Sequence, residues 1–363
     1  MASTAGSIAG HRQRPAAMPE WPMTSKHRVA IVGLGMALGP HLRSLEALDR
    51  RVEIAACYSP TAARRAAFAA RHRWPLAPDL KAILADDSIT IVFILTPPNS
   101  HLELVERCAS AGKHVLLEKP IDVTVERARK AVEAMERAGR TLAIMLQHRF
   151  RAGSRRLERL VEAGELGSLV AASAAIRWWR PPSYFAEPGR GIKARDGGGV
   201  LITQAIHTLD LFQSLAGPIA TVAAAAATSP LRAIDTEDIA GAAITFANGA
   251  IGTIDATTVA YPGFPERIEL VGDKGTAILS AETLDLWFKD GRHLHEEGVA
   301  SKSGGADPMD FPHDAHQALI TDFLDAIDEG RQPVTHGREV LKVQILIEAI
   351  LRSAAEGRAV RLA

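Results

Sequence analysis

The sequence predicts an α/β protein with two parts. The N-terminal part is expected to be a doubly wound parallel sheet, and the C-terminal part an α/β domain with a large, open and mostly antiparallel sheet. The chain has 363 residues, which is more than a single hydrophobic core usually serves. Strand-like and helix-like stretches alternate over the first 150 residues, whereas strand-like runs follow one another in most of the remainder.

In the first part, each short apolar run is followed by a longer stretch with helical periodicity. The expected strands are 28–32, 52–58, 89–95, 114–117 and 142–146, and the expected helices are 36–48, 60–71, 100–111 and 123–138. Parallel strands need a crossover connection, and helices of this length supply it. Residues 27–148 are therefore predicted to form the first domain.

The second part, residues 149–363, is rich in long apolar runs separated by hairpin signals. Asn248-Gly249 and Asp273-Lys274-Gly275 are typical of tight turns between antiparallel strands. The expected strands are 169–178, 219–227, 238–246, 250–260 and 267–272, and the expected helices are 154–163, 199–215, 314–329 and 339–355. Residues 1–26 have no such pattern and are predicted to be a disordered tail.

Composition excludes several classes of partner. The chain has 42 basic and 42 acidic side chains, which gives no electrostatic reason to expect nucleic acid. No apolar run is long enough to cross a membrane, and two isolated cysteines, Cys57 and Cys108, favour a reducing cytoplasm. His313 and His316 flank Asp314 without an evident third ligand, so we predict no metal site.

A glycine-rich turn follows the first expected strand. Gly33-Leu34-Gly35-Met36 leads into the first helix, and such glycines let a pyrophosphate approach the backbone at a helix N-terminus. Leu38 stands where the third glycine of the GxGxxG pattern is expected, and Gly39 follows one place later. The turn alone is common, but its place at the start of a strand–helix array predicts a Rossmann domain that binds NAD or NADP.

The end of the second strand bears on the choice between these two cofactors. An acidic residue commonly binds the adenine ribose of NAD at this position, but here the sequence has Ser59, with Arg64 and Arg65 one turn later. Ser59 would not repel a 2′-phosphate and Arg64 could pair with it, which favours NADP. Equally, the two arginines could form a solvated helix face.

Polar segments follow the next three strands. They contain Thr96, Pro97, Asn99 and His101 after the third strand, Glu118 and Lys119 after the fourth, and Gln147 after the fifth. Because the carboxyl ends of parallel strands meet at one edge, we expect these residues to line the cofactor crevice.

The order of these segments, followed by Gly197-Gly198-Gly199, His207 and Asp210, resembles the Gfo/Idh/MocA oxidoreductases. The resemblance runs from about Arg28 to the C-terminus. It implies a Rossmann domain joined to an open-sheet domain, with the substrate between them near the nicotinamide. It also implies that Lys119 contacts nicotinamide and substrate, and that His207 is the acid–base group. Thr203 departs from the family, many of whose members have an aspartate there.

The chemistry of alcohol oxidation agrees with these roles. A hydroxyl proton must leave as hydride leaves the same carbon, and a histidine near its ordinary pKa can accept that proton. A lysine beside a cationic nicotinamide has its charged form disfavoured, so it could share the proton.

The substrate region is expected around Arg149, Trp179, Arg180, Thr203 and His207. Cations and aromatic faces in one loop suit a polyhydroxylated substrate that carries an acid or phosphate. The Gln147-His148-Arg149 motif and this loop resemble the branch that oxidises nucleotide-linked amino-sugar uronates. The same cluster could instead pack against a neighbouring subunit.

The main hypothesis is thus oxidation of a secondary alcohol on a sugar, sugar acid, nucleotide sugar or cyclitol. Two alternatives remain: glycoside cleavage or epimerisation through transient oxidation by tightly held NAD, and a non-catalytic dinucleotide-binding regulator. The open sheet would leave apolar stretches at 222–227 and 251–259 exposed, so a homodimer or homotetramer is expected.

Overall fold

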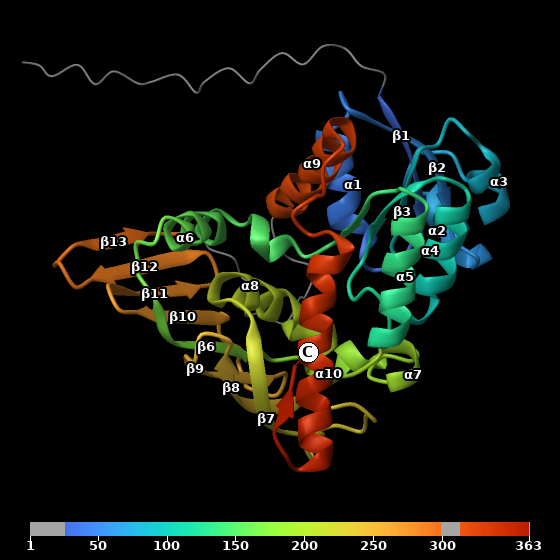
Figure 1. Cartoon of the computed structure of the whole chain (residues 1–363). Helices are drawn as coiled ribbons and strands as arrows, with labels where there is room; N and C mark the ends of the chain where they lie inside the picture. The colour runs from blue at the N-terminus through green and yellow to red at the C-terminus, as the bar shows by residue number, and fades with distance from the viewer. Residues whose placement is uncertain (1–25, 299–312, 363) are drawn as a thin grey trace, which may run out of the picture.

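The computed structural model describes residues 26–298 and 313–362. All of the predicted tail except Lys26 lies outside the described residues. Within these ranges the chain forms two sheets that lie on either side of a group of helices (Figure 1). The predicted fold class, a parallel sheet followed by a large and mostly antiparallel sheet, is confirmed.

The first sheet has five parallel strands in the order β2-β1-β3-β4-β5. Its strands are β1 His27–Val32, β2 Val52–Tyr58, β3 Ile91–Ile94, β4 His114–Leu117 and β5 Leu142–Ile144. The accompanying helices are α1 Leu38–Ala47, α2 Ala62–Ala69, α3 Leu80–Ala85, η1 Pro98–Ser100, α4 His101–Ser110, α5 Val125–Arg137 and η2 Gln147–Phe150. All four residues of β3 are buried, because helices cover both faces of the sheet.

The second sheet has nine strands in the order β13-β12-β11-β10-β6-β9-β8-β7-β14. Its strands are β6 Leu169–Arg177, β7 Ile219–Ala227, β8 Ile239–Phe246, β9 Ile251–Thr257, β10 Arg267–Gly272, β11 Gly275–Ser280, β12 Thr283–Phe288, β13 His293–Glu296 and β14 Val360–Arg361. Neighbours are antiparallel except for β6 and β9. Both predicted hairpin turns are present: Asn248-Gly249 joins β8 to β9, and Asp273-Lys274 joins β10 to β11.

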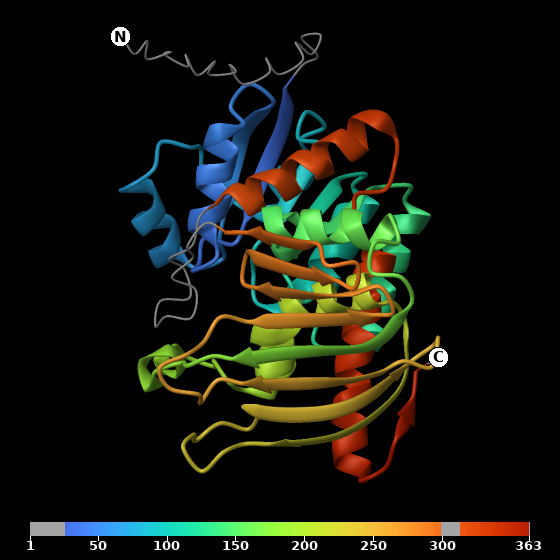
Figure 2. The same cartoon turned by 90° about the vertical axis from the view of Figure 1, so that its left-hand side faces the viewer.

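Helices cover one face of this second sheet. They are α6 Ala152–Glu162, α8 Ile206–Ala216 and α10 Gly337–Glu356, while the shorter η3 Pro182–Ala186, α7 Lys193–Asp196 and η4 Leu201–Ala205 lie in the connections. Figure 2 looks onto the opposite face, across which the strands run uncovered. Burial alternates accordingly: Ile251 and Trp287 are exposed, whereas their strand neighbours Gly252 and Leu286 are buried.

Helix α9 (Asp314–Glu329) has the predicted bounds but packs with the first sheet. Its residues Leu319, Ile320 and Phe323 share a hydrophobic core with Val29 and Ile31 of β1. In Figure 1 this helix lies beside α1, at the opposite end of the colour scale. The chain therefore returns to the first sheet after most of the second sheet is complete.

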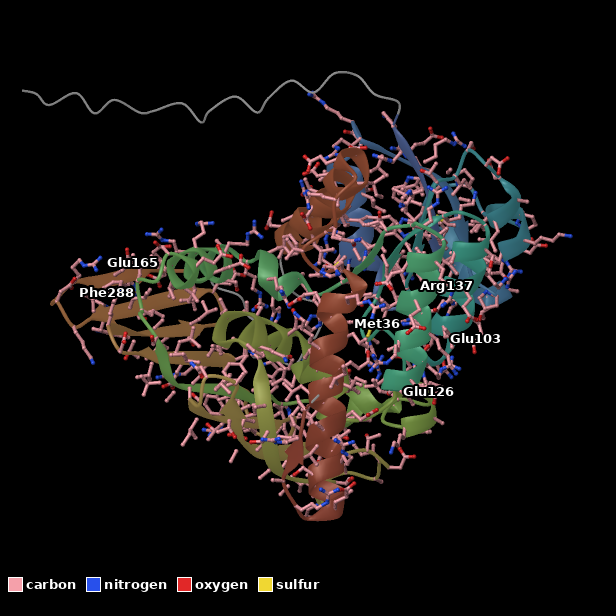
Figure 3. The ribbon with its side chains drawn as sticks, in the orientation of Figure 1. Met36, Glu103, Glu126, Arg137, Glu165 and Phe288 are labelled. Carbon is pink, nitrogen blue, oxygen red and sulfur yellow. The ribbon has the colours of Figure 1, made fainter. Side chains whose placement is uncertain are left out.

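The carboxyl ends of the first sheet point towards the helices of the second part, and the candidate site lies there. Figure 3 labels Met36 in this region, between the two parts of the molecule. Across residues 26–298 and 313–362, none of the helices is both long enough and apolar enough to cross a membrane.

Candidate active site

The glycine turn after β1 forms one wall of a cavity of about 600 Å³ between the two parts. Gly33 has φ +112°, and a Cβ there would lie 2.6 Å from the carbonyl carbon of Leu95. Only glycine fits both this backbone conformation and this close approach. Gly35 and Met36 line the cavity, while Gly33 supports the turn from behind. The N-cap residue of α1 is Ala37, whose side chain cannot accept a hydrogen bond from the first turn of the helix. Backbone N–H groups of this turn therefore remain available for an anion.

The segment after β2 carries Ser59, Arg64 and Arg65. Ser59 is buried and its Oγ accepts the N–H of Thr61 at 3.3 Å. Arg65 donates to the carbonyl oxygen of Ser59 at 2.6 Å, so it shapes the loop. Arg64 instead lines the cavity, and a Cβ added to Gly35 would lie 3.4 Å from its Nη1. The structure thus separates two arginines that the sequence could not distinguish.

The segment after β3 is divided between the cavity and the protein interior. Thr96 and Pro97 line the cavity. Asn99 is exposed outside it, and its carbonyl oxygen accepts from Arg127 at 3.3 Å. His101 is fully buried, with its ring nitrogens 2.9 Å from the carbonyl oxygen of Thr96 and 3.0 Å from that of Pro120. The structure does not bring Asn99 and His101 to the cofactor crevice; His101 holds the loops after β3 and β4 together.

Glu118 and Lys119 follow β4 and both line the cavity. Glu118 Oε1 lies 2.8 Å from Nε2 of the buried His41 on α1. Burial raises the pKa of Glu118, but the hydrogen bond and charge of His41, with Lys119, outweigh it and leave the pKa below its usual value. Glu118 is therefore ionised, and its hydrogen bond to His41 fixes its position next to Lys119.

Lys119 reaches across to the second part of the molecule. Its Nζ donates to the backbone carbonyl oxygen of Thr203 at 2.6 Å. Burial lowers the pKa of Lys119, Glu118 raises it, and Arg190 and Arg180 lower it again, with a net decrease. The ammonium of Lys119 is thus easier to deprotonate than that of an exposed lysine.

The segment around Thr203 is not the continuous α-helix that the sequence predicts. Leu201–Ala205 forms a π-helical turn (η4), and α8 begins only at Ile206. Before it, Gly199 N and Leu201 N donate to the Glu237 carboxylate at 2.9 and 3.1 Å. A Cβ at Gly199 would lie 1.7 Å from the carbonyl oxygen of Glu237. The glycine run therefore lets this turn approach the neighbouring backbone closely.

His207 lies one helical turn beyond Thr203 and lines the cavity with an exposed fraction of 9%. Burial lowers its pKa well below the ordinary value, and Lys119 and His148 lower it further. The imidazole is therefore neutral, with a free lone pair, but it is a weaker base than the histidine near its ordinary pKa that is expected from the sequence. His148, in η2, also lines the cavity, and its ring centroid is 5.0 Å from that of His207.

Gln147 and Arg149, which flank His148, have different surroundings. Gln147 lines the cavity, and its Oε1 is buried without a hydrogen-bond partner, as an acceptor awaiting a ligand would be. Arg149 does not reach the cavity. Its Nε and Nη2 donate to the two carboxylate oxygens of Asp210 at 2.6 and 2.7 Å, and the pair is buried. The predicted substrate contact of Arg149 is therefore replaced by a buried ion pair.

The basic aromatic loop contributes part of its residues. Arg180 lines the cavity and its Nε donates to Gln204 Oε1 at 3.0 Å. Arg190 also lines the cavity. Its guanidinium carbon lies 4.4 Å from the ring centroid of Tyr184, and its Nη1 donates to the Tyr184 hydroxyl at 2.7 Å. Trp179 lies outside the cavity, edge-on to Tyr261 and beneath Arg232. Tyr184 and Arg190 line the cavity from this loop but were not among the predicted site residues.

Several other residues at the site were not among the predicted site residues. His41 and His316 pack edge-on with ring centroids 5.7 Å apart, and His316 lines the cavity. Burial lowers the pKa of His316 to about 3. Arg151 and Glu282 line the cavity from two further segments. Among the described residues no group of three or more histidines, cysteines or carboxylates could hold a metal ion.

A parallel sheet with a glycine turn, a free helix N-terminus and a lysine–histidine pair across a cavity define a dinucleotide-dependent oxidoreductase. Comparison with known families agrees. Residues 27–146 match the "Oxidoreductase family, NAD-binding Rossmann fold", and residues 154–278 match the "GFO/IDH/MocA C-terminal domain". The chain belongs to the Gfo/Idh/MocA oxidoreductase family.

Individual relatives support the same class. The chain is 30% identical over 346 residues to D-apiose dehydrogenase of Paraburkholderia graminis, covering 92% of this chain and 89% of that protein. It is 28% identical to inositol 2-dehydrogenase of Rhizobium meliloti, covering 78% and 84%. The structure of the WlbA dehydrogenase from Bordetella pertussis in complex with NADH and UDP-GlcNAcA is 28% identical, with a TM-score of 0.81 and coverage of 93% and 99%.

The protein is thus an NAD(P)-dependent dehydrogenase acting on CH–OH groups, of the type that oxidises sugars, nucleotide sugars or cyclitols. This confirms the family and the enzyme class predicted from the sequence.

Proposed function

We propose that this dehydrogenase oxidises a secondary alcohol of a sugar-like compound that carries an anionic group, such as a sugar acid or a nucleotide sugar. The observation that carries the proposal is the placement of Lys119 and His207 in one cavity together with Arg180 and Arg190. The first two suit proton transfer from a hydroxyl, and the two guanidinium groups suit a carboxylate or phosphate.

The dinucleotide would be held by residues 27–148 at the strand ends. Gly35, Met36 and the uncapped start of α1 fit its pyrophosphate, and Gln147 Oε1 offers an unpaired acceptor. When bound in its oxidised form, the nicotinamide supplies the hydride acceptor. Arg64, which lies over Gly35 at the cavity wall, supports our proposal that NADP is preferred to NAD.

Proton transfer would be performed by this chain's own side chains. His207 is neutral because it is buried, so it accepts the hydroxyl proton as the carbonyl forms. Lys119 has a lowered pKa and can donate a hydrogen bond to the same oxygen or share the proton. Thr203 binds Lys119 through its backbone carbonyl oxygen, so the lysine is positioned without a carboxylate at residue 203.

An anionic substrate group would bind at the cavity wall that residues 149–363 supply, where Arg180 and Arg190 lie. Arg180 is 4% exposed and Arg190 is part-buried, so ion pairs with a ligand there would be shielded from solvent. Gln204 Nε2 donates to the Tyr184 hydroxyl at 2.5 Å and Arg180 donates to Gln204, which fixes these donors in advance. The WlbA relative, bound to UDP-GlcNAcA, supports this substrate class.

The test is stopped-flow absorbance at the reduced-nicotinamide band with NAD and NADP in turn. The substrate panel would contain D-apiose, myo-inositol, D-glucuronate and UDP-GlcNAcA. We expect an acidic compound to be oxidised fastest. No reduction with any compound, despite cofactor binding measured by calorimetry, would contradict the proposal.

The same preparation separates the two alternatives. Cofactor that co-purifies, does not exchange and undergoes no net redox change would indicate transient oxidation during glycoside cleavage or epimerisation. Cofactor binding without turnover of any sugar, but with a partner protein bound, would indicate a regulator.

We also propose that the chain assembles through the uncovered face of its second sheet. Ile251 is 64% exposed and Trp287 44% exposed on that face, and burying them in a homodimer or homotetramer would remove apolar surface from water. Light scattering coupled to size exclusion would measure the assembly, and Ile251→Lys should weaken it. Cys57 and Cys108 are both free and buried, which supports a reducing cytoplasmic location.

A further inference from the structure

His148 and His207 form a pair of imidazoles at the cavity wall. Their ring centroids are 5.0 Å apart and the rings are tilted by 30°. Both residues are buried, with exposed fractions of 4% and 9%. In each ring Nδ1 is buried and has no hydrogen-bond partner. Two buried imidazole nitrogens without hydrogen-bond partners lower the stability of the fold, unless a proton or a ligand binds to them.

Among the residues that the structure describes, one of the two rings has a carboxylate behind it. Glu266, which precedes β10, has its Oε1 4.0 Å from His148 Nδ1. The same oxygen accepts from Arg151 at 2.5 Å, whereas Glu266 Oε2 is buried without a partner. A small rotation would bring this carboxylate into hydrogen-bond range of a protonated His148. His207 instead faces Lys119, whose cation disfavours a proton on that ring.

The other charges around the pair lie on several elements. Arg151 after η2, His316 on α9 and Lys119 after β4 lower the pKa of His148, after the larger effect of burial. Glu282, beyond β11, lies 3.8 Å from Arg151 and partly offsets that cation. Two imidazolium ions at 5 Å would repel strongly, by roughly two orders of magnitude in the second proton-binding constant at an effective dielectric constant of about 20. The pair can therefore hold one proton but not two.

We propose that His148 and His207 act as a one-proton pair, in which His148, backed by Glu266, takes over the proton that His207 removes from the substrate hydroxyl. This inference rests on the proposed function. The O–H bond breaks and its proton goes to His207, while its electrons form the carbonyl as the hydride leaves to the oxidised dinucleotide of the dehydrogenase reaction. The proton then passes to His148 and from there to solvent, which restores a neutral His207. His148 is thus a positioning residue for the proton.

This arrangement replaces a group that the family usually has at residue 203. Thr203 has no carboxylate to pair with His207. Its hydroxyl donates to the carbonyl oxygen of Gly199 at 2.6 Å. Glu266 would supply the missing negative charge from the other side, through His148.

The first experiment needs no substrate. Histidine side-chain ¹⁵N spectra of the full chain would be recorded between pH 8 and the onset of unfolding, with signals assigned by His148→Gln and His207→Gln. We expect the first proton of the pair to appear on His148 while His207 stays neutral. In H148Q the proton should appear on His207 at a higher pH than in the wild type, and in E266Q uptake by His148 should move to lower pH. Identical titration of His207 in the wild type and H148Q, or no uptake by either ring, would overturn the proposal.

The second experiment uses the panel compound that the wild type oxidises fastest. H148Q should keep both KM values within about threefold and lose about 10- to 100-fold in kcat, with a larger solvent deuterium isotope effect. E266Q should show a smaller loss, and H148Q/E266Q should be no slower than H148Q, because both act on one proton path. A purely structural role would instead raise KM or give additive losses, and would overturn the proposal.

His114→Gln is the matched control. His114 lies on β4 outside the cavity, where its Nδ1 accepts the N–H of Thr141 at 3.0 Å. Its loss should lower stability but leave kcat and the isotope effect unchanged. If the wild type oxidises no panel compound, the proposed function fails, whereas the spectra still decide whether the histidine pair exists.

Discussion

Replacing Arg149 tests whether this residue binds substrate or supports the fold. In the structure its guanidinium makes two hydrogen bonds to Asp210, at 2.6 and 2.7 Å, and lies 3.3 Å from Glu339. The side chains of Arg149 and Asp210 are 7% and 1% exposed, so the ion pair is almost completely withdrawn from water. Arg149→Met keeps much of the side-chain volume but leaves the Asp210 carboxylate buried without its partner.

The expected cost follows from that burial. Breaking a buried ion pair by removing one member typically costs about 3–5 kcal/mol, and the two short bonds place this pair within that range. Burial already raises the pKa of Asp210 more than Arg149 lowers it, and removing Arg149 should raise it further. A carboxyl with a folded-state pKa above its unfolded value loses stability as pH rises. The penalty of R149M should therefore be larger at pH 8 than at pH 5.

Urea unfolding followed by circular dichroism would measure this free energy at both pH values. Arg149→Met/Asp210→Leu is the matched control, because it removes both charges and should recover much of the loss. Substrate KM in the folded R149M protein should change less than threefold. A stability loss below about 1 kcal/mol together with a tenfold rise in substrate KM would refute the structural role and restore Arg149 as a substrate contact.

Three further predictions follow from the cavity. Lys119→Met and His207→Asn should each lower kcat by about 10²-fold or more while the cofactor Kd, measured by calorimetry, stays within an order of magnitude; lost cofactor binding would contradict the assigned roles. Arg64→Ala should lower kcat/KM for NADP several-fold more than for NAD, and equal effects would argue against a phosphate contact. Because the pKa of His316 is lowered to about 3, the unfolded state binds more protons below pH 6.5, and stability should fall with acidification. His316→Gln should remove about 1 kcal/mol of the stability difference between pH 7.5 and pH 5.5 in urea titrations, and an unchanged difference would show that His316 is not the group responsible.

Much of the fold could be predicted because local patterns determine it. The strands His114–Leu117, Ile219–Ala227 and Arg267–Gly272 have the predicted bounds, as does helix Asp314–Glu329. The destination of that helix could not be predicted, because an amphipathic pattern gives a helix an apolar face but does not say which sheet will cover it. The strands β11–β13 were missed because each is only four to six residues long, too short for an alternating pattern to stand out.

The site was predictable to the level of the segment but not of the side chain. Gln147, His148 and Arg149 are consecutive in a 3₁₀ turn, where side chains project about 120° apart. Gln147 and His148 line the cavity, whereas Arg149 turns away from it. The direction of Arg149 is set by its ion pair with Asp210, which is sixty-one residues away in the sequence. His101 shows the same limitation: its three nearest acceptors are backbone carbonyl oxygens that only the folded loops bring together.

The departure at residue 203 connects these observations. In a regular α-helix the carbonyl oxygen of Thr203 would accept the N–H of His207, but the π-helical turn presents it to Lys119 instead. A carbonyl oxygen holds an ammonium less strongly than a carboxylate does, so burial and the neighbouring guanidinium groups lower the pKa of Lys119, although Glu118 and, to a smaller extent, Asp196 raise it. In the mechanism that we propose, the hydroxyl proton is therefore accepted by the neutral His207 and shared with Lys119, whose pKa is lowered. A carboxylate at residue 203 would strengthen proton binding at both, whereas Glu266, placed behind His148, provides negative charge without touching either.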